Sequence, residues 1–203
     1  MAILGTAYHE AGHAVVDFDH GNLAGTVTIV PDADRHSAGS SQAEEWDSGL
    51  GEGSTGDDGV AAIEAKVVAL YAGLEAERLV DPGAVVGAGD DYEKVQWHAD
   101  LAGLDDVALD ALRHRAAEHV ARRRDVIARL ARVLVDLQTL DQFQVECVIE
   151  GEPFRTGNSL RSPLYTAHLS EGAQRRYEEA RSRPKQRVHI PPFDPDDPTE
   201  ATL

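Results

Sequence analysis

The sequence predicts a mainly α-helical fold with a minor β element. In several long segments apolar residues recur every three or four positions, which is the spacing of one helical face. Only residues 26–30 are a clear β-branched run, and Pro31 follows that run as it would follow a strand. The chain has 203 residues, 42% of them hydrophobic, which is enough to bury one core.

The first predicted helix covers residues 3–18, where apolar residues recur at spacings of three and four, and Gly21 ends it. The predicted strand of residues 26–30 follows. Residues 32–59 are rich in Gly, Ser, Asp and Glu, which is typical of a long loop. We expect one weak strand in this loop, near residues 38–42.

The second predicted helix covers residues 60–80, because five apolar residues form one stripe on it: Ile63, Val67, Leu70, Tyr71 and Leu74. The sequence Asp81-Pro82-Gly83 ends this helix. A third helix is predicted from about residue 90 to residue 102. Asp90 is its expected N-cap, with Glu93 three residues later.

One long helix, or two shorter ones, is predicted for residues 106–137. Its core face should carry four aliphatic residues: Ile127, Leu130, Leu134 and Leu137. A last short helix should follow, because Thr139 and Gln142 have the spacing of a capping box.

These elements predict one domain over residues 1–150. Seven of the nine prolines lie beyond residue 150, in a segment that lacks apolar periodicity. We therefore expect residues 151–203 to form a proline-rich C-terminal extension that is partly disordered.

Charge and cysteine content exclude several classes of protein. The formal net charge is −17, which disfavours nucleic acid and anionic membrane surfaces as partners. Cys147 is the only cysteine, so no intramolecular disulfide can form, and its apolar surroundings in the sequence predict a buried, inert thiol. No secretory signal and no apolar run of about 18 residues is evident. We expect a cytoplasmic location.

The pattern His-Glu-x-x-His occurs once, at residues 9–13, within the first predicted helix. Residues four apart lie on the same helical face, so His9 and His13 can bind one zinc ion. Glu10 is the expected catalytic base, because a carboxylate beside the metal can take a proton from bound water and pass it to the leaving amine. Gly12 is unfavourable inside a helix and indicates that another element passes close by.

A catalytic zinc ion usually has three protein ligands, and the motif supplies two. A metzincin is excluded, because Val16 and Asp19 stand where that class has glycine and histidine. The candidates for the third ligand are glutamates of a later helix or one of two adjacent aspartates: Glu75, Glu77, Asp90 and Asp91.

Several segments together resemble one known family. Residues 7–16 (Ala-Tyr-His-Glu-Ala-Gly-His-Ala-Val-Val) are similar to the zinc helix of FtsH, the ATP-dependent zinc metalloprotease. Further similarity lies in the following strand, in a helix rich in alanine and glycine, in a Gly-Ala-Ser-Asn-Asp segment and in two late helices: residues 26–31, 72–80, 87–94, 122–125 and 137–141. The resemblance covers roughly residues 1–150 and implies an FtsH-peptidase-like helical zincin domain.

The resemblance also implies site residues. Asp91 would be the third zinc ligand, with Asp90 in the place of the family's asparagine, and Glu75 and Glu77 would be structural helix residues. His98, seven residues after Asp91, is a weaker candidate ligand. A different interpretation of Asp91 is a first-turn residue favoured by the helix dipole.

The sequence departs from the FtsH family in two respects. No Gly-x-x-x-x-Gly-Lys-Ser/Thr pattern is present, so we expect no ATP-driven unfolding of substrates by this chain. The loop of residues 40–59 is more acidic and glycine-rich than the family's second strand, which binds substrate as an added strand.

Two functions are therefore expected from the sequence. The first is a stand-alone zinc metalloendopeptidase that cleaves flexible or unfolded polypeptides, in which the acidic loop would either gate access or favour basic substrates. The alternative is a zinc-stabilised binding or regulatory module with little or no peptidase activity, which would partner an ATPase on another chain. Assembly into an oligomer is compatible with both functions.

Overall fold

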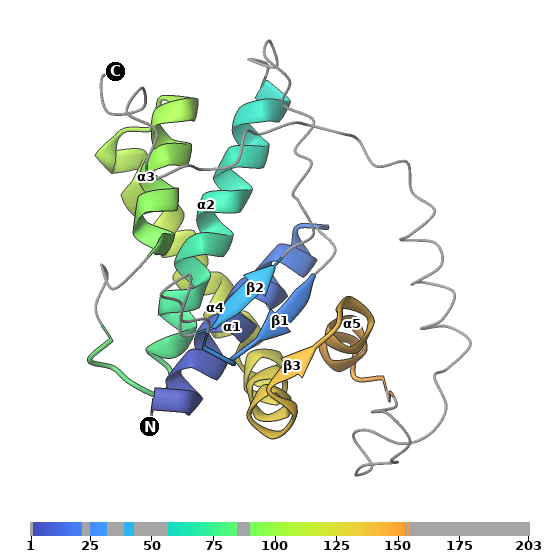
Figure 1. The fold of residues 1–203 in the computed structure, drawn as a ribbon. Coiled ribbons are helices and arrows are strands. Elements are labelled where there is room, and N and C mark those ends of the chain that lie inside the picture. Colours follow the sequence, from blue (N-terminus) through green and yellow to red (C-terminus); the bar gives the residue numbers. More distant parts are fainter. Residues whose placement is uncertain are drawn as a thin grey trace.

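The computed structural model describes residues 2–21, 25–31, 39–42, 57–84, 90–152 and 154. These residues form five helices: α1 (Ala2–Asp19), α2 (Asp57–Glu77), α3 (Asp90–Ala102), α4 (Asp106–Leu137) and α5 (Gln142–Glu150). Three short strands accompany them: β1 (Thr26–Thr28), β2 (Ser40–Gln42) and β3 (Thr139–Leu140). The prediction of a mainly helical fold with a small β element is confirmed (Figure 1).

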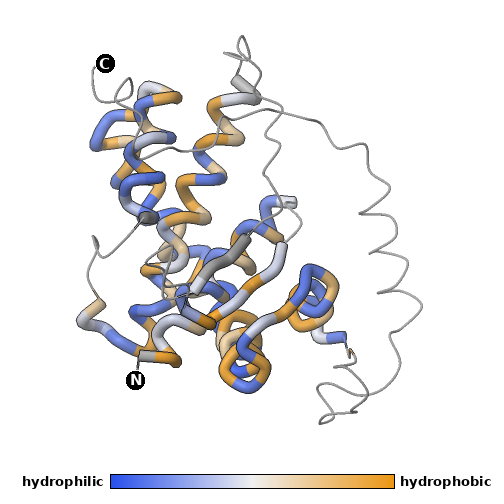
Figure 2. The backbone as a smooth tube through the Cα atoms, in the orientation of Figure 1, coloured by the Kyte–Doolittle hydropathy of each residue, from blue (hydrophilic) through white to orange (hydrophobic). Residues whose placement is uncertain are grey.

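Helix α1 lies at the centre of the helical layer and packs against both α2 and α4. Figure 2 shows apolar and polar bands alternating along α2 and α3, as expected of amphipathic helices. At the crossing of α1 and α2 the two backbones approach closely. A Cβ at Gly12 would lie 2.4 Å from the carbonyl oxygen of Ala72, which explains this glycine inside a helix.

The three strands form one antiparallel sheet in the order β2-β1-β3. Val27 of β1 is fully buried and pairs with Ser41 on one side and Leu140 on the other. The sheet lies along α1, with α5 beyond its β3 edge (Figure 1). Both strands expected around residues 26–30 and 38–42 are thus present, although each has only three residues.

Helix α4 is a single helix of 32 residues rather than two. Asp105 caps its N-terminus, where the side chain accepts a hydrogen bond from the Ala108 amide (2.8 Å). Three of the four residues predicted for its core face are buried and Leu137 is partly buried.

The predicted capping box of the last helix is wrong. Thr139 belongs to β3, where its hydroxyl lies 2.8 Å from that of Thr28 across the strand pair. The capping box of α5 is formed by Asp141 and Gln144 instead. Pairing of Thr139 with β1 is a tertiary interaction that outweighs the local capping signal.

Other sequence predictions can be compared with the structure. Cys147 is buried as expected, whereas Ile3 and Leu4, which begin the periodic run of the first helix, are exposed. Within the described ranges no helix is long and apolar enough to cross a bilayer. The proline-rich extension beyond residue 154, most of the acidic loop, and the side chain of Asp90 lie outside the described residues.

Candidate metal centre

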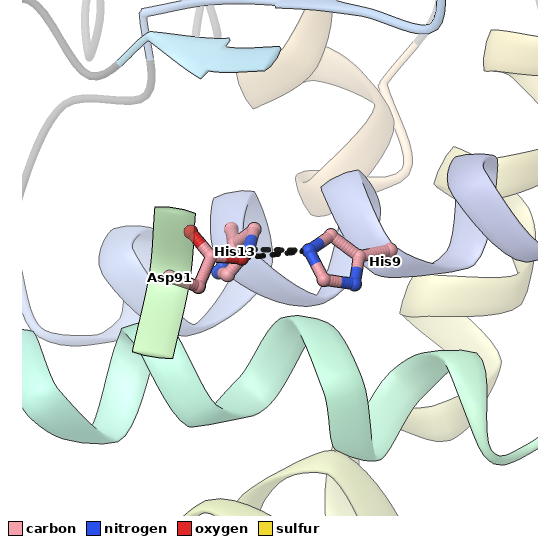
Figure 3. Close-up of side chains that lie close together, drawn as sticks. All are labelled: His9, His13 and Asp91. Carbon is pink, nitrogen blue, oxygen red and sulfur yellow. Dashed lines mark hydrogen bonds and ion pairs between the residues drawn. The ribbon is translucent and has the colours of Figure 1, made fainter. Parts of the chain in front are cut away.

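Three side chains from two helices converge on one point. Figure 3 shows His9 and His13 of α1 facing Asp91 of α3. The Nε2 atoms of the two histidines lie 3.0 Å apart. The Oδ2 atom of Asp91 lies 2.8 Å from His9 Nε2 and 3.0 Å from His13 Nε2. Of the described residues, only these three form a group with metal-ligand spacing.

A contact on the far side of the His13 ring determines which nitrogen faces this point. His13 Nδ1 lies 2.7 Å from the carbonyl oxygen of Ala69, which can only accept a hydrogen bond, so Nδ1 is the donor. In the neutral ring Nε2 then carries a lone pair towards His9 and Asp91. Gly73 of α2 leaves room for the ring, because a Cβ there would lie 2.3 Å from His13 Nε2.

His9 is held in a similar way by a carboxylate. Its Nδ1 atom lies 3.4 Å from Oε2 of Glu77, on α2. Burial lowers the pKa of His9, but Asp91 and Glu77 together outweigh burial and raise this pKa to about 10. The pKa of Glu77 is lowered by the same contact. The surroundings of His9 therefore favour positive charge, which a proton or a metal ion can provide.

Asp91 is ionised in this environment. Burial would raise the pKa of its carboxyl group, but the imidazoles of His13 and His9 hold that pKa well below its ordinary range. Its second oxygen, Oδ1, lies 3.4 Å from Nζ of Lys94, one helical turn further along α3. The two oxygens of this carboxylate thus face different partners.

The donor set fits a zinc ion. In a tetrahedral site with bonds of about 2.0–2.1 Å, ligand atoms lie about 3.3 Å apart, a few tenths of an ångström more than the separations found here. Two imidazole nitrogens and a carboxylate oxygen are common zinc ligands. Two lone pairs that face each other at 3.0 Å repel unless a cation lies between them.

Glu10 is buried beside the cluster, with 6% of its surface exposed. Burial raises the pKa of its carboxyl group, and the imidazoles of His13 and His9 act in the opposite direction. Gly39, the residue directly before β2, lies close to this side chain, because a Cβ there would be 3.0 Å from Glu10 Oε1. A buried carboxyl group with a raised pKa, close to a metal position, is suited to exchange protons.

Two other candidate ligands, Glu75 and His98, lie outside the cluster. Glu75 forms ion pairs with Arg78 and Arg113 and takes no part in the cluster. His98 is not part of the cluster either. Its Nδ1 lies 2.6 Å from the Lys94 carbonyl oxygen, and its ring packs edge-on against Trp97. Helix α3 begins at Asp90, but the structure does not describe that side chain.

Four contributions to the site were not foreseen from the sequence: the Ala69 carbonyl group, the gap at Gly73, the contact of Glu77 with His9, and the contact of Lys94 with Asp91. The weak sequence signal for the α2 residues was a Gly and a Glu four apart in a helix of small residues. That signal does not identify the residue of α1 that each one contacts.

No protein-family model matches the chain, and a search of curated proteins gave no significant match.

Proposed function

We propose that the chain is a zinc metalloendopeptidase with an FtsH-peptidase-like domain over residues 1–150. One observation carries the proposal: His9, His13 and Asp91 bring three ligand atoms within about 3 Å of one another, next to a buried Glu10. Asp91 is 82 residues from His9 in the sequence, so its position there is independent of the motif.

In this proposal each residue has a distinct role. His9, His13 and Asp91 would hold zinc, which when bound polarises the scissile carbonyl group and makes a bound water more acidic. Glu10 would accept a proton from the attacking water and donate it to the leaving amine. The Ala69 carbonyl group and the Glu77 carboxylate would orient the two imidazoles through their Nδ1 atoms.

The proposed substrates are flexible or unfolded polypeptides. His13 and Glu10 are each less than a tenth exposed, whereas the side chains of His9 and Asp91 are 24% and 31% exposed. A peptide bond must therefore approach closely to reach the buried residues. An extended segment can do so, but the surface of a folded protein cannot without local unfolding.

The test is cleavage of a dye-labelled unfolded protein by zinc-loaded wild type and by Glu10→Gln. This substitution keeps the size of the side chain and removes its proton-accepting carboxylate. Both proteins should bind zinc, and only the wild type should cleave; loss of activity from removing a catalytic base is typically about 100-fold to 10,000-fold. Equal cleavage by both proteins would contradict the proposed role of Glu10.

The same experiment distinguishes the proposed peptidase from the alternative function. Zinc in both proteins with cleavage by neither would favour a zinc-stabilised binding or regulatory module. Addition of a candidate ATPase partner to that reaction would then test whether the missing component lies on another chain. Basic and acidic test peptides cleaved at equal rates would rule out a preference for basic substrates.

A further inference from the structure

Lys94 lies next to the candidate metal centre and has no role in the function proposed above. It follows Asp91 by three residues on α3, which places both side chains on one helical face. Its ammonium nitrogen lies 3.4 Å from Asp91 Oδ1, and 40% of its side chain is exposed. Exposed ion pairs with this spacing contribute little to stability.

The partners of Asp91 distinguish this pair from an ordinary surface ion pair. Oδ2 is directed at the Nε2 atoms of His9 and His13, while Oδ1 is directed at Lys94. A carboxylate can bind a metal ion through one oxygen or through both. An ammonium group on Oδ1 favours the first arrangement, because binding through both oxygens would move Oδ1 away from Lys94.

Three carboxylates surround the cluster, those of Glu10, Glu77 and Asp91. With one ammonium group and one divalent ion their formal charges balance, so Lys94 complements the site without competing for a ligand atom.

We propose that Lys94 is a positioning residue that keeps Asp91 bound to the metal through Oδ2 alone and so leaves a coordination position open. The inference rests on the proposed metal site. A catalytic zinc site has three protein ligands and a fourth position for water or substrate, and binding through both oxygens of Asp91 would add a fifth ligand that crowds this position. Lys94 touches Asp91 and not the reacting atoms.

Cobalt(II) provides a direct test, because its visible absorption is strong in four-coordinate sites and weak when coordination increases. Wild type should bind one Co²⁺ with the strong spectrum, Lys94→Met should lose absorption severalfold, and Lys94→Arg should restore most of it. Lys66→Met is the matched control, because Lys66 also pairs with an aspartate at 3.4 Å, Asp17. The control should keep the wild-type spectrum.

Each result has one meaning. If Lys94→Met binds Co²⁺ with the wild-type spectrum, the positioning role is wrong and the proposed metal site stands. If Lys66→Met loses absorption as Lys94→Met does, general destabilisation explains the change and the inference fails. If the wild type binds no Co²⁺ at His9, His13 and Asp91, the proposed metal site and the inference fail together.

Discussion

Gly73 of α2 lies directly against the imidazole ring of His13. A Cβ at residue 73 would come within 2.3 Å of His13 Nε2 and 2.5 Å of its Cε1 atom. Both are far shorter than any van der Waals contact, and the ring cannot retreat while its Nδ1 stays bonded to Ala69. The close approach of α2 thus determines where one of the proposed metal ligands lies.

Gly73→Ala should therefore weaken zinc binding. The added methyl group must push the His13 ring away from Asp91, and we expect zinc affinity to fall by roughly 10-fold or more. Gly83→Ala is the control, because among the described residues a Cβ there would meet only the Asp81 carboxylate, at 3.3 Å. Titration against a zinc-chelating dye measures both variants, and equal affinities would show that the ring tolerates the methyl group.

Gly12→Ala should destabilise the fold although alanine is the better helix former. Helix propensity would favour alanine by about 1 kcal/mol, but the new Cβ would lie 2.4 Å from the Ala72 carbonyl oxygen and 2.6 Å from the Ala76 Cβ. Forcing α1 and α2 apart should cost about 1–3 kcal/mol or more. Urea denaturation measures the free energy of unfolding.

Gly5→Ala provides the comparison for Gly12→Ala on the same helix. Its Cβ would meet Glu77 Oε1 at 3.2 Å, the end of a flexible side chain that can move. This variant should be close to the wild type in stability. If Gly12→Ala were as stable as Gly5→Ala, the close crossing of α1 and α2 would be refuted.

Glu77→Gln should lower zinc affinity without unfolding the protein. The carboxylate lies 3.4 Å from His9 Nδ1 and favours the orientation in which His9 Nε2 points at Asp91. Loss of such a partner typically costs about 10-fold to 100-fold in metal affinity. Glu75→Gln is the matched control, since that carboxylate pairs with arginines instead. Equal zinc affinity in the two variants would argue against a role for Glu77.

Cys147 should resist thiol reagents in the folded protein. Burial raises the pKa of its thiol from 9.0 to about 12, so near pH 8 the reactive thiolate is about a thousandfold rarer than for an ordinary cysteine. Labelling with a chromogenic disulfide should be slow until denaturant is added. Rapid labelling of the native protein would show that the residue is accessible.

The raised pKa of Cys147 also predicts that the stability of the protein falls at high pH. Below the ordinary pKa of a thiol, Cys147 is neutral in both states and contributes no pH dependence. Above that value the unfolded chain releases the proton while the folded protein retains it, so the contribution of Cys147 to stability falls as pH rises from about 9 towards about 12. Cys147→Ser should reduce this loss in denaturation curves measured over that range.

Local features of the sequence were sufficient to predict the helices and half of the site. His9 and His13 are four residues apart, so a helix alone brings them together. Asp91 is far away in the sequence, and only the resemblance to FtsH singled it out from Asp90, Glu75 and Glu77. The structure brings Asp91 to the histidines, which helical periodicity could not have predicted.

The remaining features depend on tertiary packing. Glu77 contacts His9, and Gly73 makes room for His13, because α2 crosses α1 at one particular position along the helix. No local pattern encodes that position. Thr139 shows the same limit, since strand pairing with Thr28 gives it a place that its capping-box spacing did not indicate.

The most direct test of the metal centre is the zinc content of Asp91→Ala, measured by equilibrium dialysis at a fixed low free zinc concentration. Asp100→Ala is the control, because Asp100 is an exposed aspartate on the same helix. Wild type and Asp100→Ala should each retain one zinc ion per chain, and Asp91→Ala should lose it while its circular dichroism stays unchanged. Full zinc retention by Asp91→Ala would contradict the proposed site of His9, His13 and Asp91.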